Sequence, residues 1–424
     1  LTHKIHVFVI MSKHMKKWVL FMGVLFSTSF ASAADNSATE LAALKAQLKM
    51  LTERLATLEA KQQQTAVQVN ATNAQLTEQK AEITKTVEPK ANWTSRIALS
   101  GDLRDRMEYI DERGKSVRTR NRVRARLGID AKVNDSLNVG IRLASGGEDP
   151  TSTNQTLDGA FSSKGINLDL AYFKWKLTDD WSLTGGKMKN PLYKAGKTPL
   201  MWDGDLNPEG ASVQYKNNGW QATAFAFSVD ERKAATDVLL TGAQVLKNFS
   251  MGDNSMNASI GYYNYMELQG STPFIDGKAR GNTLDANGGI ANDFDLFEGA
   301  VEFKTELANM PLGIFATYVE NMEADDENQA FALGFNLGKV KNKGSWSLGY
   351  SYMDVEADAV YALFNDSDFA GGETDSNGHI LKAGYGLNKN MSFGLTYIAS
   401  EQDQSKAQQT AYDRLQLDLK FKFK

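Results

Sequence analysis

The chain has 424 residues, of which 47 are Lys or Arg and 51 are Asp or Glu, and its mean hydropathy is −0.40. The acidic balance argues against a general nucleic-acid binder, because such a domain normally carries a dominant basic surface. The absence of cysteine excludes disulfides, thiolate metal sites and cysteine-linked haem. After the first 33 residues, no stretch approaches the ~20 apolar residues of a membrane-spanning helix.

Residues 1–33 are predicted to be an upstream extension followed by a secretory signal peptide. Residues 13–17 are rich in lysine, residues 18–30 are apolar, and Ala31-Ser32-Ala33 has the pattern of a signal-peptidase site. The apolar run is shorter than a transmembrane helix requires. The sequence therefore predicts export, with cleavage before Ala34.

Residues 37–88 are predicted to form a helix with a coiled-coil seam. Apolar residues recur at alternating spacings of three and four: Leu41, Leu44, Leu48, Leu51, Leu55 and Leu58. The register continues to Ile83 with a mostly polar seam. Because such a stripe needs partner helices, we expect a periplasmic oligomerisation stem, preferably three-stranded, that is also a candidate contact for peptidoglycan. Pro89 ends the helix, and residues 89–94 are predicted to be a linker.

From residue 95 to residue 424 the hydrophobic period changes to two, the period of a β-strand. Sixteen strands are predicted, near 95–109, 117–133, 136–144, 166–178, 181–188, 210–217, 219–229, 237–247, 255–266, 292–306, 311–321, 329–339, 345–356, 377–387, 391–400 and 411–423. The strand number is even, and tight turns alternate with long connections. This pattern predicts an all-β transmembrane antiparallel barrel.

Aromatic residues near the predicted strand ends favour a barrel over a soluble β-sandwich, which could also alternate its turn lengths. Trp181, Trp220, Tyr265 and Tyr412 are among the residues expected to form girdles at the membrane interfaces. The last strand alternates cleanly between apolar and polar residues and ends at Phe423 followed by Lys424. It resembles the terminal strand that outer-membrane proteins present to their assembly machinery.

The second predicted strand carries five arginines on one face. This arginine ladder consists of Arg118, Arg120, Arg122, Arg124 and Arg126. An arginine on the lipid face near the bilayer centre costs about 2 to 4 kcal/mol, so the ladder is predicted to face the lumen. Arg104, Arg106 and Arg142 have the same parity on neighbouring strands and extend the basic wall. The alternative is a set of inter-strand ion pairs that hold the barrel together.

The segments GDLRDRMEY (101–109), RTRNRVRARLGIDAKVND (118–135) and DLNPEG (205–210) resemble the Gram-negative outer-membrane "putative porin" family. The chain is similar in plan to porins that carry a periplasmic coiled-coil stem before the barrel. The resemblance implies a homotrimeric diffusion channel and does not name the solute.

The third long connection, residues 189–209, contains Asp203, Asp205 and Glu209. In general porins the corresponding loop folds into the barrel, with acidic residues facing an arginine cluster. By that analogy this loop is expected to form the constriction, where a transverse field would orient polar solutes. The alternative is an ordinary surface loop.

These features predict an outer-membrane porin for passive diffusion of small hydrophilic solutes and ions. We expect an anion preference that falls when Arg120, Arg122 and Arg124 are replaced by alanine. The expected partners are outer-membrane lipid, lipopolysaccharide, further copies of the chain, and small anionic or polar solutes, but not nucleic acid. No cofactor, metal or enzymatic activity is predicted, and His379 is the one histidine after residue 33. The alternative function is a structural tether to the cell wall with little or no conductance.

Overall fold

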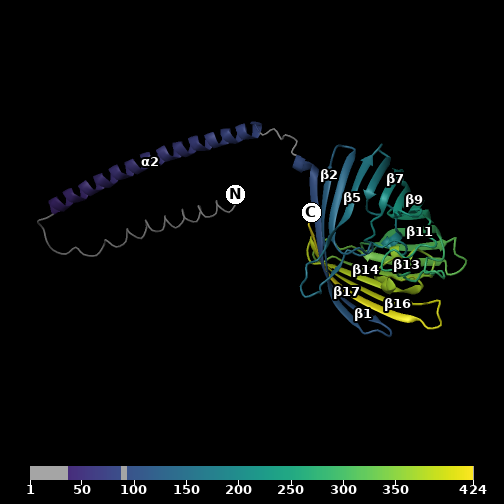
Figure 1. Ribbon diagram of the computed structural model, residues 1–424. Helices are drawn as coiled ribbons and strands as arrows, with labels where there is room; N and C mark the ends of the chain where they lie inside the picture. Colours follow the sequence, from purple (N-terminus) through teal and green to yellow (C-terminus); the bar gives the residue numbers. More distant parts are fainter. Residues whose placement is uncertain (1–36, 87–92, 424) are drawn as a thin grey trace. The chain divides into compact units, whose positions relative to one another are not determined.

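The computed structural model describes residues 37–86 and 93–423, with side chains from 42 to 80 and from 94 to 423 (Figure 1). The predicted signal peptide lies outside the described residues, as does most of the predicted linker. The chain divides into two compact units near residue 90, a helical unit and a strand unit.

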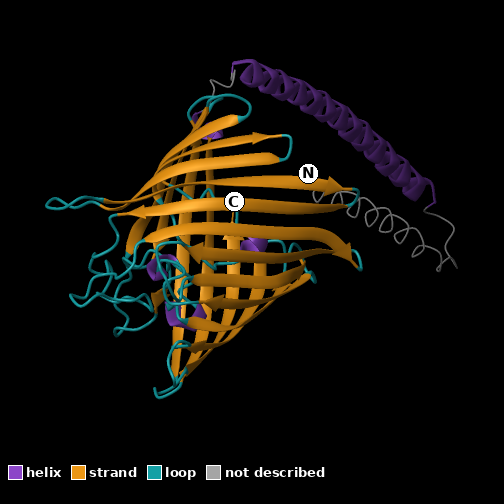
Figure 2. Cartoon of the chain, turned by 90° about the vertical axis from the view of Figure 1, so that its right-hand side faces the viewer, coloured by secondary structure: helices purple, strands orange, loops and turns teal. Residues whose placement is uncertain are grey.

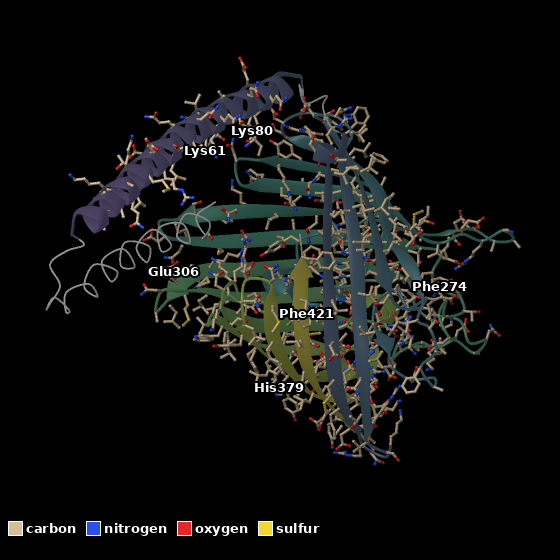
Figure 3. The ribbon with its side chains drawn as sticks, turned by 90° about the vertical axis from the view of Figure 1, so that its left-hand side faces the viewer. Lys61, Lys80, Phe274, Glu306, His379 and Phe421 are labelled. Atoms are coloured by element: carbon tan, nitrogen blue, oxygen red, sulfur yellow. The ribbon has the colours of Figure 1, made fainter. Side chains whose placement is uncertain are left out.

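The helical unit contains α2, Ser37–Thr86, a helix of 50 residues. The predicted helix is confirmed. The seam leucines Leu44, Leu48, Leu51 and Leu55 are each more than half exposed within the helical unit. Figure 3 shows side chains such as Lys61 and Lys80 along this helix. The coiled coil itself stays a prediction. No helix among the described residues combines the length and apolarity that a membrane crossing needs.

Seventeen strands are present between residues 97 and 423. They are β1 Ile97–Glu112, β2 Arg118–Lys132, β3 Leu137–Ser145, β4 Gln155–Thr156, β5 Ile166–Lys176, β6 Trp181–Lys187, β7 Glu209–Asn217, β8 Trp220–Asp230, β9 Val238–Met251, β10 Asn254–Met266, β11 Phe294–Leu307, β12 Met310–Asn321, β13 Gln329–Gly338, β14 Trp346–Val355, β15 Ser376–Gly386, β16 Met391–Gln402 and β17 Thr410–Phe423. Sixteen match the predicted strands. The unpredicted β4 is a two-residue strand that pairs with β2 beyond the end of β3.

The strands form one closed antiparallel barrel. Each long strand pairs with its neighbours in sequence, and β1 pairs with both β2 and β17, which joins the first strand to the last. Tight turns such as residues 218–219 and 308–309 connect the strands at one end, and longer loops gather at the other (Figure 2). The predicted barrel is confirmed, and its alternating connections define a short-turn end and a long-loop end.

The two faces of the wall have opposite chemistry, as the period of two requires. On β1, Leu99 and Met107 are exposed on the outside, whereas Arg106 and Glu108 are buried on the inside. At the short-turn end, four tryptophans are 43–48% exposed on the outer face: Trp175, Trp181, Trp220 and Trp346. These four occupy the positions expected of an interfacial girdle.

Part of the inner face is apolar. A buried cluster lines the inside of β8 to β16 and continues into three connections, residues 188–208, 267–293 and 356–375. Tyr265 is 1% exposed within it, with its ring 6.0 Å from that of Phe294. Tyr412 is also buried on the inner face. Both tyrosines were expected at a membrane interface. This expectation is wrong, because their strand parity points them inward, where the loops that enter the barrel cover them.

Candidate functional site

Four of the five ladder arginines lie on the inner face of β2 in contact with carboxylates. Arg120 and Arg122 lie near Glu108, with nitrogen–oxygen distances of 2.5 and 3.8 Å. Arg124 and Arg126 share Asp102, at 2.9 and 2.8 Å. The fifth, Arg118, is exposed and makes no ion pair in the described part of the chain. Most of the ladder arginines therefore take part in inter-strand ion pairs, as the alternative interpretation of the sequence proposed.

The neighbouring predicted cations are also mostly paired. Arg106 is bound by Asp418 at 2.6 Å and by Asp368 at 3.2 Å. Arg142 forms an ion pair with Asp169. Arg104 differs, because its only hydrogen-bond partner among the described residues is the amide oxygen of Asn154.

Sequence reasoning missed Arg414 on β17. Its guanidinium lies 2.9 Å from Glu108 and 2.7 Å from Asp368, and its side chain is 3% exposed. Arg414 occupies the polar face of the last strand, opposite Ile110 of β1 in the register. The parity of β17 could have identified it, since the sequence already placed the polar face of this strand beside β1.

Residues 188–208, which we call the crossing loop, span the lumen. At one side, the Tyr193 backbone N–H donates to Gln244 of β9 (2.7 Å), and the Tyr193 hydroxyl donates to Glu302 of β11 (2.6 Å). At the other side, Asp205 lies 3.5 Å from Arg124 of β2. Because β2 and β11 are eight strands apart in a ring of sixteen, these anchors lie on opposite walls.

The three acidic residues of the predicted constriction have different surroundings. Asp205 contacts both Arg124 and Arg126, the latter at 3.4 Å. Asp203 forms no ion pair with an arginine among the described residues; its carboxylate accepts the backbone N–H groups of Asp205 (2.6 Å) and Ser367 (3.1 Å). Glu209 begins β7 and pairs with Lys187 at 2.7 Å. The structure therefore brings Asp205 to the arginines and keeps the other two away.

The contact between Asp203 and Ser367 joins the crossing loop to the 356–375 loop. The Asp203 N–H also donates to the carbonyl of Phe364 (2.8 Å). The 356–375 loop in turn reaches the arginine side through Asp368, which contacts Arg106 and Arg414. The two loops thus hold each other and the wall.

The pKa values of the loop carboxyls depend on the charged groups that lie next to them. Burial raises the pKa of a carboxyl, but Arg124 and Arg126 outweigh it and hold the pKa of Asp205 below its ordinary value. Arg414 and Arg106 likewise lower the pKa of Asp368 against the effect of burial. Burial and the neighbouring Asp366 raise the pKa of Asp203. The contacts of Asp205 and Asp368 are therefore present at neutral pH and are lost only as the pH falls through the lowered pKa values.

A cavity of about 450 Å³ lies where the crossing loop meets the basic wall. Its lining includes Arg104, Arg106 and Arg124 on one side and Lys382 and Ile380 of β15 on another. A second cavity, of about 640 Å³, lies nearer the short-turn end and is lined by Arg142, Lys189 and Lys422 among others. In both cavities cationic side chains outnumber the carboxylates.

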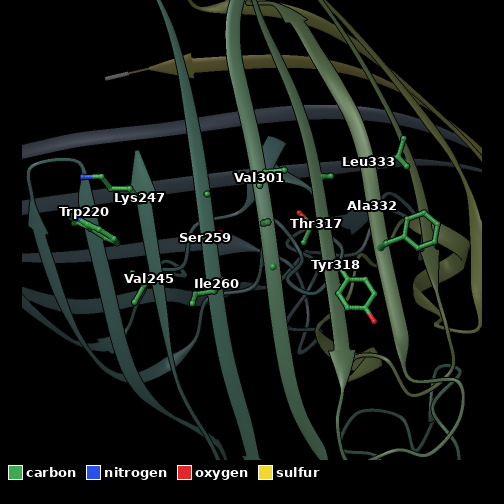
Figure 4. A pocket seen from close by; sticks show the side chains of 15 residues that line it. Trp220, Val245, Lys247, Ser259, Ile260, Val301, Thr317, Tyr318, Ala332 and Leu333 are labelled. Carbon is green, nitrogen blue, oxygen red and sulfur yellow. The ribbon is translucent and has the colours of Figure 1, made fainter. Parts of the chain in front are cut away.

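Two other features lie on the outer face. A groove of about 560 Å³ crosses β9 to β13, where Ile260, Val301 and Leu333 are exposed (Figure 4). His379 also points outward, and its ring nitrogen lies 2.9 Å from the Tyr350 hydroxyl (Figure 3). Neither feature belongs to the lumen.

Comparison with solved structures finds similar chains. The chain is similar to OprB of Pseudomonas putida, with a TM-score of 0.54 and 11% identity over 79% of this chain and 96% of that chain. It is also similar to the outer membrane channel DcaP of Acinetobacter baumannii, with a TM-score of 0.46 and 17% identity over 77% and 97% of the two chains. OmpT of Vibrio cholerae gives a TM-score of 0.46 and 13% identity over 77% and 99%. The likeness to OprB shows the fold.

The search of curated proteins found no match. The comparison with protein families found one match, to a family described as "Putative porin", over residues 111–288 and 301–423. These residues make up more than half of the chain and cover most of the barrel. The chain therefore belongs to the "Putative porin" family.

Proposed function

We propose that the protein is an outer-membrane diffusion channel for small hydrophilic solutes and ions, with a preference for anions. The observation that carries this proposal is the charged cavity beside the crossing loop, inside a closed barrel of the porin family. Seven Lys or Arg side chains and five Asp side chains line this cavity. The cations therefore exceed the carboxylates by two, and a net positive charge in the lumen raises the local concentration of anions.

The proposed setting follows from the two units. The barrel would lie in the outer membrane, in contact with lipid and lipopolysaccharide, and the helical unit would lie in the periplasm as the stem of a homotrimer. The exposed seam leucines of α2 support this association, because a stripe of leucines is stable when packed against other helices. Peptidoglycan is a candidate partner of the stem.

The alternative function is a structural tether, and one observation favours it. The apolar cluster formed by the three inward connections fills part of the barrel, as a plug would. A tether predicts no conductance and an envelope defect when the stem is removed.

Planar-bilayer recording of the purified mature protein separates the two functions. We expect stepwise single-channel conductance. Under a potassium chloride gradient, we expect a zero-current potential with the sign of the chloride equilibrium potential. Strong cation selectivity would contradict the anion preference and leave the channel in place. A complete lack of conductance would instead favour the tether.

A further inference from the structure

The cavity beside the crossing loop holds cations that form no ion pair with a carboxylate among the described residues. Of its seven cationic side chains, four have a carboxylate oxygen within 4 Å: Arg106, Arg124, Arg126 and Lys420. The other three, Arg104, Lys197 and Lys382, have none among the residues that the structure describes.

Arg104 is the most constrained of the three. It is 8% exposed, and its Nε atom has no hydrogen-bond partner in the described part of the chain. In the sheet register its lateral neighbours are Lys420 on β17 and Arg124 on β2, so three cations lie side by side. Like charges directly opposite one another destabilise an antiparallel sheet, and a buried charge without a counter-ion is costly. Asp418 and Asp205 act on Arg104 only from beyond 4 Å, so among the described residues no carboxylate contacts this guanidinium directly.

Lys382 and Lys197 face the same space from other elements. Lys382 is on the inner parity of β15 and is exposed, and Lys197 follows Gly196 in the crossing loop and is also exposed. Two carboxylates of the cavity also form no ion pair among the described residues, and each accepts a backbone N–H. Asp203 accepts the N–H of Asp205, and Asp366 accepts the N–H of Asp368 at 3.0 Å.

We propose that Arg104, Lys197 and Lys382 form a binding site for a compact oxyanion in this cavity, and that these three cations, rather than the arginine ladder, determine anion selectivity. The proposal rests on the proposed channel function. A guanidinium offers several N–H donors to oxyanion oxygens in a fixed geometry, and the two ammonium groups add mobile positive charge. Ladder arginines such as Arg120 already donate to a carboxylate, which leaves them less able to attract a permeating anion.

The test is block of chloride current by inorganic phosphate in planar bilayers that contain the full mature protein. Wild-type channels are expected to show reversible, concentration-dependent block. Arg104→Gln removes the buried donor and is expected to raise the phosphate concentration for half-block by about tenfold or more, as the loss of a charge-assisted hydrogen bond implies.

Lys382→Gln keeps the test valid if Arg104→Gln fails to fold, because Lys382 is exposed and makes no ion pair in the described chain. It is expected to weaken the block and to lower the chloride-to-potassium permeability ratio. Lys343→Gln, the same change in the turn between β13 and β14, is the matched control and should behave as wild type. Arg120→Gln is expected to change selectivity less than Lys382→Gln.

The outcomes separate the site from the channel function. Conductance without phosphate block, or equal block in wild type and both cavity variants, would overturn the binding site and leave the channel in place. If Arg120→Gln lowers the chloride-to-potassium permeability ratio more than Lys382→Gln does, the arginine ladder determines selectivity, and the proposal is also overturned. A wild-type protein that does not conduct would overturn the channel function and the site with it.

Discussion

At the scale of single residues, two cations at equivalent positions on the wall can differ in whether a carboxylate contacts them. Arg124 and Arg104 are lateral neighbours with the same inward parity, yet Arg124 shares Asp102 and Asp205 while Arg104 has no carboxylate within 4 Å in the described chain. Parity could be read from the alternation of the sequence. The pairing could not, because Asp205 comes from a loop about 80 positions later in the chain.

Replacing Asp205 tests the balance of charge in the cavity. Asp205→Asn removes one negative charge that Arg124 and Arg126 share, so we expect the chloride-to-potassium permeability ratio to rise by about twofold. The zero-current potential under a salt gradient measures this ratio. Asp179→Asn, in an exposed turn, is the matched control and should leave the potential unchanged. A fall in anion preference would contradict the proposed role of Asp205.

At the scale of elements, the strands could be predicted from the local alternation of the sequence, whereas the packing of the loops could not. Sixteen strands were predictable because alternation repeats over many residues within each one. The inner apolar cluster was not, since residues such as Tyr265 and Met353 face the lumen where a water-filled barrel would place polar side chains. Those positions are apolar because the crossing loop and the 356–375 loop pack on them.

The crossing loop can be tested at Gly196, where the backbone φ is +57°. A Cβ atom there would lie 2.1 Å from the Phe315 ring of β12. Gly196→Val therefore adds a clash and about 1 to 3 kcal/mol of backbone strain, which should detach the loop from this wall. We expect a larger single-channel conductance with an intact barrel by circular dichroism.

Gly147→Val is the control for this change, because a Cβ atom at Gly147 meets no atom within 4 Å and its backbone is not left-handed. Its conductance should match that of the wild type. If Gly196→Val also conducts as the wild type does, the crossing loop does not limit the passage.

At the scale of the whole molecule, two units with different hydrophobic periods are joined in one chain. α2 has a seam with the heptad period, and the barrel has a period of two. The seam leucines of α2 are exposed within the helical unit, which is the observation behind the proposed stem.

The stem is tested by placing charge in its seam. Leu48→Glu combined with Leu55→Glu puts carboxylates at two seam positions, where packing against partner helices would bury them at high cost. We expect the detergent-solubilised oligomer to dissociate at lower temperature, as measured by light scattering, while single-channel conductance is retained. Ala56→Glu, outside the seam, should leave the oligomer intact. If the oligomer of the seam variant dissociates at the same temperature as that of the wild type, α2 does not contribute to assembly.

The sequence alone determined the helix, the sixteen strands, the antiparallel barrel and the inward parity of the arginines, because each depends on a period within a continuous segment. Only the tertiary structure decided which cations are neutralised, since Asp205 and Asp368 reach Arg124 and Arg106 through long loops whose path no local pattern specifies. The tertiary structure likewise decided that Arg104 contacts Asn154 and no carboxylate within 4 Å among the described residues.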